Sequence, residues 1–328
     1  MFENRKILIT GGTGSWGQEL TRQILKKNPS EVRIFSRNES SQVEMKQMFN
    51  EHPALFFILG DVRDQKALSD ACKGVDYIFH LAALKHVPVC EYQPYEALKT
   101  NVTGTRNVIE AALVNQVENV IYISTDKAAN PANFYGFTKA IGEKLFIHAN
   151  TLSSRSKFIC IRSGNVLGTN GSVIHVFKDQ MERKGKIEIT DRRMTRFFLT
   201  IEDAVELLFR ATEESIGGEI FVMKMPAIRI IDLAHVLIEH SGSENINIEE
   251  KGLRPGEKIH ELLLTEFESN HTVVYKDHYY IILPPIEIEG VREHYKHFPA
   301  MSGEIYHSNY NLMSKLEIKR MLEKGGFL

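Results

Sequence analysis

The sequence contains few cysteines, no long apolar run and almost no net charge. Its three cysteines, Cys72, Cys90 and Cys160, are odd in number and widely spaced, so they form neither a disulfide framework nor a zinc pattern and fit a reducing cytoplasm. The formal net charge of −2 provides no basic field for nucleic acid or an anionic membrane. No apolar run approaches the roughly 18 residues of a membrane-spanning helix, and the opening MFENRKILITGG leaves no room for a signal peptide. We therefore expect a cytoplasmic protein with neither a nucleic-acid nor a membrane partner.

Short apolar runs alternate with helical stretches through the first half of the chain. The expected strands are residues 6–10, 31–36, 56–62, 76–82, 120–125 and 156–164, and the expected helices are 17–27, about 94–115 and about 133–153. Most of these runs are apolar on both faces, which suits a parallel sheet covered by helices on each side. The pattern predicts an α/β fold with a doubly wound parallel sheet of the Rossmann type.

The second half is less regular. A loop-rich region around GNVLGTNGSV precedes an amphipathic helix, a strand and another helix, expected at 200–211, 218–225 and 231–240. We expect residues 1–164 to form a dinucleotide-binding domain and 165–328 to form mainly a substrate-binding region, with segments near 195–225 returning to the first domain. The tail, including HYYIILPP and a final helix near MSKLEIKRML, either closes the substrate pocket or extends an oligomer interface.

A glycine-rich turn, Thr10-Gly-Gly-Thr-Gly-Ser-Trp-Gly17, directly follows the first expected strand. Glycine allows a tight turn, lets the backbone approach a pyrophosphate and lets the following helix pack closely on the strand. The alternative is a tight turn with a purely structural role. Because the pattern stands between a strand and a helix at the start of an alternating sheet, it predicts a dinucleotide site. The predicted cofactor contacts in this turn are Gly11, Thr13, Gly14, Ser15, Trp16 and Gly17.

The residues at the end of the second expected strand indicate which dinucleotide binds. NAD sites usually place a carboxylate there for the ribose 2′-hydroxyl, whereas this chain has Ser36, Arg37 and Asn38. An arginine with small polar neighbours suits a 2′-phosphate, which predicts NADP, and the nearby Glu39 keeps NAD as the alternative. The other predicted cofactor contacts are Asp61 and Val62 beside the adenine, Ala82 and Ala83 beside the nicotinamide ribose, and Asn101.

The stretch STDKAANPANFYGFTK places Tyr135 and Lys139 four residues apart in an expected helix, so both side chains lie on one face. A lysine ammonium near a phenol lowers the pKa of that phenol. Tyr135 can then accept a proton from a sugar hydroxyl as a hydride leaves its carbon, and Lys139 can hold the nicotinamide ribose. A surface helix pair is the alternative. The position after the fifth strand of a nucleotide-binding sheet favours the catalytic interpretation.

Five stretches together resemble an extended short-chain dehydrogenase/reductase: TGGTGSWG, HLAALKHVP, STDKAANPANFYGFTK, GNVLGTNGSVI and LRPGEKIHE. Within that class the chain is most similar to the UDP-N-acetylglucosamine 4,6-dehydratases that invert carbon 5. That group makes precursors of pseudaminic acid and related deoxy-amino sugars of bacterial surfaces. The glycine turn and the Tyr/Lys pair are common to the class, whereas Thr-Asp-Lys before Asn-x-Tyr is much more specific.

The resemblance implies a role for the adjacent Asp126 and Lys127. Oxidation at carbon 4 acidifies the hydrogen on carbon 5, and elimination then requires a base at carbon 5 and an acid at the carbon 6 hydroxyl. The resemblance assigns Lys127 as this base, Asp126 as this acid, Thr125 as a hydrogen-bond partner of the carbon 4 oxygen, and Tyr135 as the base for oxidation. The base must be neutral, and we expect burial and the charges of Lys139 and nicotinamide to lower the pKa of Lys127. A solvated or salt-bridged Lys127 is the alternative.

Substrate contacts also follow from the resemblance. Lys85 is placed within reach of both cofactor and sugar, with a surface lysine as the alternative. The other implied contacts are Asn165 and Arg254 at the diphosphate, Glu257 at the ribose, Val173 along the nucleotide and Thr190 near the uracil, with Arg196 as a further candidate phosphate ligand. His80 and His86 lack the partners of a metal site, so we predict no metal and expect His80 to be a core histidine.

These observations predict an NADP-dependent, redox-neutral hydro-lyase acting on UDP-N-acetylglucosamine. The product would be UDP-2-acetamido-2,6-dideoxy-beta-L-arabino-hexos-4-ulose. Two alternatives are a UDP-sugar 4-epimerase or reductase on the same fold, and a non-catalytic NADP-binding scaffold. By resemblance, the helices at 94–115 and 133–153 form a dimer interface in a homo-oligomer, which is a dimer or a hexamer.

Overall fold

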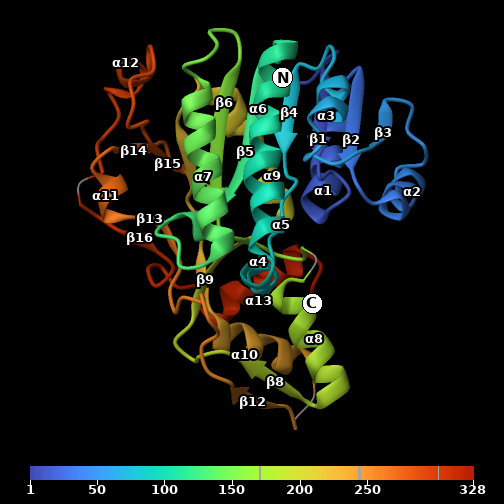
Figure 1. Cartoon of the computed structure of the whole chain (residues 1–328). Coiled ribbons are helices and arrows are strands. Elements are labelled where there is room, and N and C mark those ends of the chain that lie inside the picture. Colours follow the sequence, from blue (N-terminus) through green and yellow to red (C-terminus); the bar gives the residue numbers. More distant parts are fainter. Residues whose placement is uncertain (170, 243–244, 302) are drawn as a thin grey trace.

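The computed structural model describes residues 1–169, 171–242, 245–301 and 303–328. Within them, a nine-stranded sheet with the order β14-β15-β10-β6-β5-β4-β1-β2-β3 runs through the larger part of the molecule (Figure 1). Every neighbouring pair from β3 to β10 is parallel, and β15 is antiparallel to both of its neighbours. The strands are β1 (Lys6–Thr10), β2 (Glu31–Ser36), β3 (Leu55–Leu59), β4 (Tyr77–His80), β5 (Asn119–Thr125), β6 (Lys157–Ser163), β10 (Ile220–Met223), β14 (Thr272–Tyr275) and β15 (Tyr279–Ile282). The order β3-β2-β1-β4-β5-β6 is that of a doubly wound dinucleotide-binding sheet, which confirms the predicted fold class.

Helices cover the two faces of this sheet, because its central strands are apolar on both sides. All four residues of β4 are buried, as are those of β10. On one face α3, α6 and α7 lie side by side, while α1 packs against α9 (Figure 1). The covering helices are α1 (Ser15–Leu25), α2 (Glu39–Met48), α3 (Gln65–Ala71), α6 (Gly104–Asn115), α7 (Phe134–Ala149) and α9 (Ile201–Glu214).

The helix expected at 94–115 is divided by a wider turn. The short helix α4 (Val87–Tyr92) is followed by α5 (Pro94–Leu98), a π-helical turn η1 (Lys99–Thr103) and then α6. Such turns often mark functional positions. Asn101 lies in η1, and its side chain bonds the backbone of Leu84 on the loop after β4. The π-helical turn therefore carries the residue that holds this loop. The other long expected helix, α7, ends at Ala149 rather than near residue 153.

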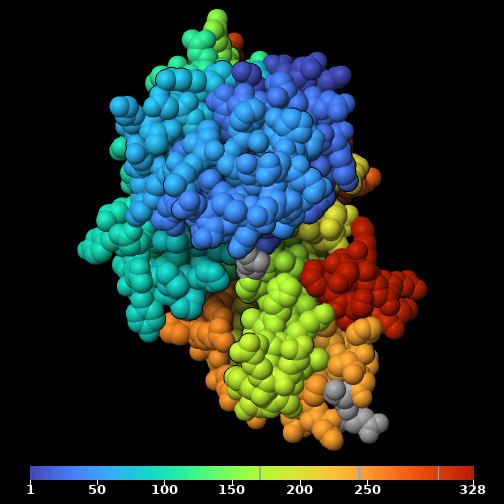
Figure 2. Space-filling model, turned by 90° about the vertical axis from the view of Figure 1, so that its right-hand side faces the viewer, coloured from blue at the N-terminus to red at the C-terminus, as the bar shows by residue number. Residues whose placement is uncertain are grey.

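A second, smaller core lies below the main sheet in Figure 1, where α8, α10 and α13 enclose apolar side chains including Ile174, Phe177 and Leu233. Figure 2 shows the α8 segment and the C-terminal segment projecting beneath the N-terminal mass. The loop-rich region of the sequence analysis contains β7 and the start of α8. The elements of this region are β7 (Asn165–Val166), α8 (Val173–Lys184), β8 (Lys186–Ile189), β9 (Thr195–Leu199), β11 (Ala227–Arg229), α10 (Ile230–Ser241), β12 (Asn247–Glu250) and α13 (Lys315–Lys324).

The C-terminal tail completes the fold. The stretch HYYIILPP contains β15, and β14 and β15 extend the main sheet at its edge beside β10. The final helix α13 begins with a capping box at Ser314 and packs on α10. The remaining elements are β13 (Leu262–Leu264), which pairs with β16 (Tyr306–His307), and the short helices α11 (Glu266–Ser269) and α12 (Val291–Tyr295). No helix among the described residues has the length and apolar character needed to cross a membrane.

Candidate active site

The glycine turn lies where β1 meets α1. Gly11 has φ +68°, a left-handed conformation that favours glycine, and a Cβ there would lie 2.8 Å from the backbone of Ala82. This close approach brings the turn against the loop that follows β4. Gly14 is the N-cap of α1 and offers no side-chain cap, so the first backbone N–H groups of the helix remain as donors for a phosphate. The other predicted cofactor contacts of this turn lie close by in the chain. Thr13 is within the turn, Ser15 and Trp16 are the first residues of α1, and Gly17 packs against Gly12.

The end of β2 lies beside the end of β3. The Arg37 guanidinium is 3.5 Å from Asp61 Oδ2, and Arg63 approaches the same carboxylate at 2.6 Å. Asn38 caps α2 by accepting a bond from the Ser41 N–H, while the Ser36 hydroxyl accepts one from Gln42. The structure thus brings four predicted cofactor residues together at one edge of the sheet, namely Ser36, Arg37, Asp61 and the buried Val62.

The loop after β4 carries Ala82, Ala83 and Lys85, and Asn101 holds it in place. The Asn101 amide oxygen accepts from the Leu84 N–H, and its nitrogen donates to the Leu84 carbonyl and to Thr138 on α7. Because protein groups occupy the Asn101 amide, the residue is positioned to shape the loop rather than to present its amide to a ligand. Burial lowers the pKa of Lys85 below its ordinary value.

The Thr125-Asp126-Lys127 stretch lies at the carboxyl end of β5, where the 3₁₀ turn η2 (Asp126–Ala128) begins. Ligands of doubly wound sheets bind at this edge. Asp126 is fully buried, and its Oδ1 accepts hydrogen bonds of 2.9 Å from the Thr125 hydroxyl and 2.9 Å from Lys127 Nζ. Asp126 Oδ2 is buried without a hydrogen-bond partner among the described residues. Asp126 and Lys127 therefore form a hydrogen-bonded acid–base unit in which Asp126 Oδ2 has no hydrogen-bond partner among the described residues.

The protonation of Lys127 differs from the expectation. Burial lowers the pKa of its ammonium, but the carboxylates of Asp126 and Glu261 outweigh burial, and the pKa is raised above the ordinary lysine value. The salt-bridged alternative therefore describes this structure, and the predicted lowering of the pKa was wrong. The main cause of the raised pKa is Asp126, bonded to Lys127 Nζ at 2.9 Å, followed by Glu261, whose Oε1 lies 3.6 Å from Lys127 Nζ.

Tyr135 and Lys139 lie in the first turns of α7, both buried. Burial raises the pKa of Tyr135 to about 12, with the Lys127 charge offsetting part of the rise. Burial lowers the pKa of Lys139 to about 7, with Glu143 opposing it. Lys139 Nζ donates to the Ile123 carbonyl at 2.6 Å and lies 3.8 Å from the centre of the Tyr122 ring. The expected lowering of the Tyr135 pKa is therefore absent from this structure, because burial outweighs the nearby cation.

The turn that contains Arg254 and Glu257 docks on the start of α7. Asn133, the N-cap of α7, accepts a bond from the Gly136 N–H and donates to the Gly256 carbonyl at 2.9 Å. Arg254 is largely exposed, and its guanidinium lies 3.9 Å from the carboxylate of Glu257. Glu257 Oε2 is buried and has no hydrogen-bond partner in the described part of the chain. The fold thus carries two predicted substrate contacts to the end of the helix that bears Tyr135.

The other predicted substrate contacts spread over the second region. Asn165 begins β7, Val173 begins α8, and the Thr190 carbonyl accepts from Gly252 after β8. Arg196 is placed differently from the expectation. It is mostly buried in β9, donates to the backbone oxygens of Thr195 and Ile259, and lies 3.5 Å from Glu261, so it neutralises that carboxylate instead of facing an exposed phosphate.

Two groups of residues at the site were not identified from the sequence, namely Glu261 and the cluster around Arg162. Glu261 is the last residue of LRPGEKIHE, but nothing in that stretch shows that it faces Lys127. A buried cluster beneath α7 joins Arg162 of β6 to Glu143 and to Glu268. Its only sequence signal is Arg162 itself, a charged residue inside an apolar strand.

His80 is a buried core histidine that bonds Thr10 and Thr105. No group of three or more potential metal-binding side chains occurs among the residues that the structure describes.

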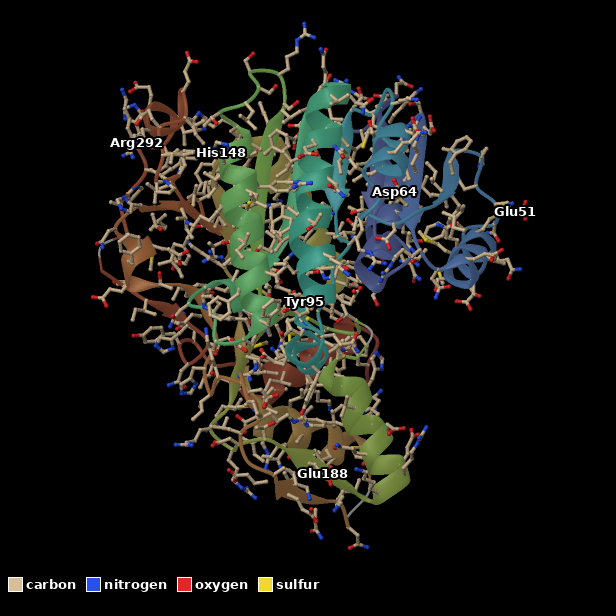
Figure 3. All side chains as sticks on the ribbon, viewed as in Figure 1. Glu51, Asp64, Tyr95, His148, Glu188 and Arg292 are labelled. Atoms are coloured by element: carbon tan, nitrogen blue, oxygen red, sulfur yellow. The ribbon has the colours of Figure 1, made fainter. Side chains whose placement is uncertain are left out.

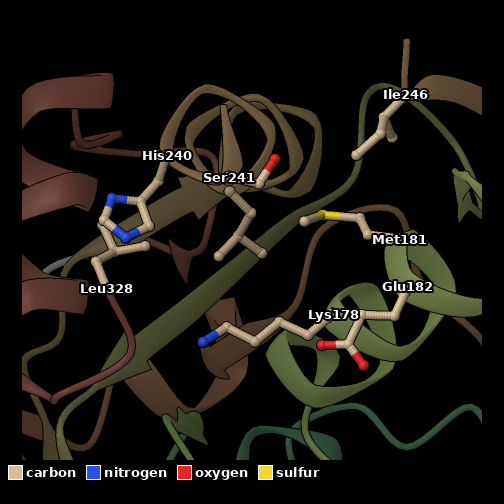
Figure 4. Close-up of a pocket in the computed structure, with 8 residues that line it drawn as sticks. Lys178, Met181, Glu182, His240, Ser241, Ile246 and Leu328 are labelled. Carbon is tan, nitrogen blue, oxygen red and sulfur yellow. The ribbon is translucent and has the colours of Figure 1, made fainter. Parts of the chain in front are cut away.

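A groove of about 300 Å³ lies between α8, α10 and the C-terminal Leu328 (Figure 4). It is lined by Lys178, Met181 and His240 among others, and none of the predicted site residues lines it. The acid–base unit and this groove are therefore separate features.

The sheet order, the glycine turn and the Tyr135/Lys139 pair on α7 define an extended short-chain dehydrogenase/reductase. More specifically, the chain belongs to the family described as polysaccharide biosynthesis protein, whose model matches residues 7–283. The chain of Pen from Bacillus thuringiensis superposes with a TM-score of 0.91 and 38% identity, covering 98% of this chain and 99% of that one.

Three relatives have different descriptions. The UDP-N-acetylglucosamine 4,6-dehydratase (inverting) of Campylobacter jejuni is 43% identical, covering 88% of this chain and 85% of its own. The UDP-glucose 4-epimerase of Rickettsia bellii is 44% identical, covering 82% and 80%. A protein of Methanocaldococcus jannaschii described as an uncharacterized membrane protein is 40% identical, covering 100% and 98%.

Proposed function

We propose that the protein is an NADP-dependent hydro-lyase that removes water across carbons 5 and 6 of UDP-N-acetylglucosamine, with inversion at carbon 5. The observation that carries this proposal is the pair of the buried Asp126 and the half-buried Lys127, joined by a 2.9 Å hydrogen bond beside Tyr135. An acid and a base next to the oxidising tyrosine are what elimination requires. The identity to the inverting dehydratase of Campylobacter jejuni supports the same reaction.

The residues at the sheet edge fit a dinucleotide. The absence of a side chain at Gly11 lets the turn pack closely on Ala82, as the glycine turns of dinucleotide sites require, and the uncapped start of α1 supplies N–H donors for a pyrophosphate. Arg37 and Ser36 would hold the 2′-phosphate of NADP, since no carboxylate ends β2. A bound cofactor would supply the hydride chemistry, as acceptor at carbon 4 and donor at carbon 6, so the net reaction would be redox-neutral.

The chain's own residues perform the proton transfers. Tyr135 in its phenolate form accepts the proton of the carbon 4 hydroxyl, and Thr125 bonds the same oxygen. Lys127 removes the carbon 5 proton, and Asp126 protonates the departing carbon 6 hydroxyl. The resting ion pair reaches this reactive state by one proton moving from Lys127 Nζ to Asp126 Oδ1, along the hydrogen bond that the structure contains. That single transfer makes the lysine neutral and the aspartate acidic together.

UDP-sugar 4-epimerase activity is the second candidate, favoured by the names of the Rickettsia relatives. An epimerase oxidises and reduces the same carbon, so it has no use for an acid and a base at carbons 5 and 6. The hydrogen-bonded Asp126–Lys127 pair supports elimination over epimerisation.

The proposal is tested by proton NMR of UDP-N-acetylglucosamine with the purified protein in heavy water, with NADP or NAD added. We expect a new methyl signal from carbon 6, deuterium at carbon 5 of the inverted product, and faster turnover with NADP. A product that keeps its carbon 6 hydroxymethyl group and has galacto configuration would establish the epimerase instead. No reaction of this sugar would overturn the proposed substrate.

We further propose a cytoplasmic homo-oligomer whose interface is formed by α6 and α7. Apolar side chains on these helices are exposed in the single chain, among them Val114, Phe137 and Ile141. The nearby Tyr95 projects from α5 at the end of the same helical layer (Figure 3).

Asn133 offers a test of the docked turn. Asn133→Ala and Asp64→Ala each remove an N-cap, of α7 and α3 respectively, and each is expected to lower the free energy of unfolding by about 1 kcal/mol. Only Asn133 also bonds Gly256, so only Asn133→Ala should raise the KM for the UDP-sugar several-fold. Figure 3 shows Asp64 away from this turn, on the β1 side of the sheet. An equal KM in both variants would show that the turn does not contribute to substrate binding.

A further inference from the structure

Glu261 is a buried carboxylate shared by two cations of the site. It lies directly before β13 and is 4% exposed. Its Oε1 lies 3.6 Å from Lys127 Nζ and 3.5 Å from Arg196 Nε, while its Oε2 is buried without a hydrogen-bond partner in the described residues. A carboxylate is almost never buried to this extent unless opposite charges compensate it.

The backbone of Glu261 is fixed on both sides. Its N–H donates to the Ser308 hydroxyl at 2.9 Å, and its carbonyl accepts from the Ser308 N–H at 2.9 Å. The Ser308 hydroxyl lies 2.7 Å from that of Thr195 on β9. Segments that are far apart in the chain therefore hold this carboxylate at a set position opposite Lys127.

We propose that Glu261 is a positioning residue for Lys127, holding its ammonium against Asp126 and setting how much of the lysine is neutral. This inference rests on the proposed role of Lys127 as the base at carbon 5. The new element is that Glu261, a residue from the C-terminal half of the chain, regulates the protonation of that base.

The charges that face Lys127 determine the direction of the effect. Asp126 and Glu261 are the anions near its ammonium, Arg196 is a nearby cation, and Tyr135 faces it from α7. Lys258, whose Nζ donates to the Ala129 carbonyl, adds a further positive charge. Removing the Glu261 charge leaves Arg196 and Lys258 less compensated, so the neutral form of Lys127 becomes more favourable.

Chemical reactivity reports the neutral fraction of Lys127 directly, because only the neutral amine is nucleophilic. We would carbamylate the NADP-loaded protein with cyanate at pH 8 and follow the Lys127 peptide by mass spectrometry, with the exposed Lys157 as an internal standard. Glu261→Gln is expected to speed modification of Lys127 at least about tenfold, since an opposite charge at this distance shifts a pKa by one unit or more. Glu261→Asp keeps the charge and should remain within about threefold of the unaltered protein.

Glu188→Gln provides a matched control. It removes a carboxylate from an ion pair with Lys184 and should leave the reactivity of Lys127 unchanged; Figure 3 shows Glu188 at the lower end of the molecule, below the main sheet. In the reaction itself, the pH of half-maximal carbon 5 exchange should move downward in Glu261→Gln, while carbon 4 oxidation stays within threefold.

The reactivity measurement needs no substrate, so it separates failure of this inference from failure of the proposed function. A Lys127 modification rate within twofold of the unaltered protein in Glu261→Gln would overturn the inference. So would equal acceleration in Glu261→Gln and Glu261→Asp, because that result indicates loosened packing rather than lost charge.

Discussion

Replacing Lys127 by methionine is expected to slow exchange of the carbon 5 hydrogen by about 10²–10⁴-fold, the range that a positioned general base contributes. Methionine preserves much of the apolar stem but carries no basic nitrogen. Oxidation at carbon 4 depends on Tyr135 and should be far less affected. It can be followed as reduced cofactor absorbing at 340 nm in a single turnover, while deuterium entry at carbon 5 is measured by NMR on the same samples.

Lys157→Met is the matched control, since it replaces an exposed lysine at the start of β6. It should leave both half-reactions unchanged. If Lys127→Met kept rapid carbon 5 exchange, another group would be the base. If it lost carbon 4 oxidation to the same degree, Lys127 would act on binding or on Tyr135 instead.

The main sheet could be predicted from the sequence because its signals are local. Apolar runs such as 6–10 and 31–36 are buried strands at the predicted positions, and the glycine turn follows β1 as expected. The same local patterns could not show β14 and β15 joining the sheet, since their pairing with β10 depends on chain segments far apart. The helix α8 was not predicted, although it begins at the last residue of the turn-rich stretch GNVLGTNGSV and continues beyond it.

In the candidate site, too, some features follow from local sequence and others depend on segments far apart in the chain. Tyr135 and Lys139 share a helix, so their joint position follows from spacing alone. The protonation of Lys127 does not follow from spacing, because Glu261, directly before β13, and Arg196 of β9 are brought to the site by the fold. The prediction from the sequence considered burial and the charges of Lys139 and nicotinamide, and it left out the carboxylates of Asp126 and Glu261, which outweigh burial. The predicted sign of the Lys127 pKa shift was therefore wrong.

The second large effect concerns stability. Arg162 is buried inside β6, where it makes two bonds to Glu143 of α7 and two to Glu268 of α11, and it donates a further bond to the Leu263 carbonyl. Arg162→Met leaves both carboxylates without their cation. Removing one partner of a buried ion pair costs about 3–5 kcal/mol, and we expect a loss of this size in urea unfolding at pH 7.5.

The pKa of Glu268 predicts how the stability loss in Arg162→Met changes with pH. Burial raises the pKa of Glu268, but the Arg162 charge and hydrogen bonds outweigh it and hold the pKa below its ordinary value. The unaltered protein therefore keeps this contribution above about pH 4.5 and loses it as the pH falls further. Without Arg162 the buried carboxyls bind protons readily, so the difference between variant and unaltered protein should shrink between pH 7.5 and pH 5.

Two further variants decide whether uncompensated charge is the cause. Arg183→Met breaks an exposed pair with Asp179 on α8 and should change stability by less than about 1 kcal/mol. Arg162→Met combined with Glu143→Gln and Glu268→Gln removes the stranded charges and should recover at least half of the loss, because neutral buried groups cost less than unpaired ions. If the triple variant were as unstable as Arg162→Met alone at every pH, lost packing at position 162 would explain the effect, and the ion cluster would have no special role in joining α7 to the C-terminal segment.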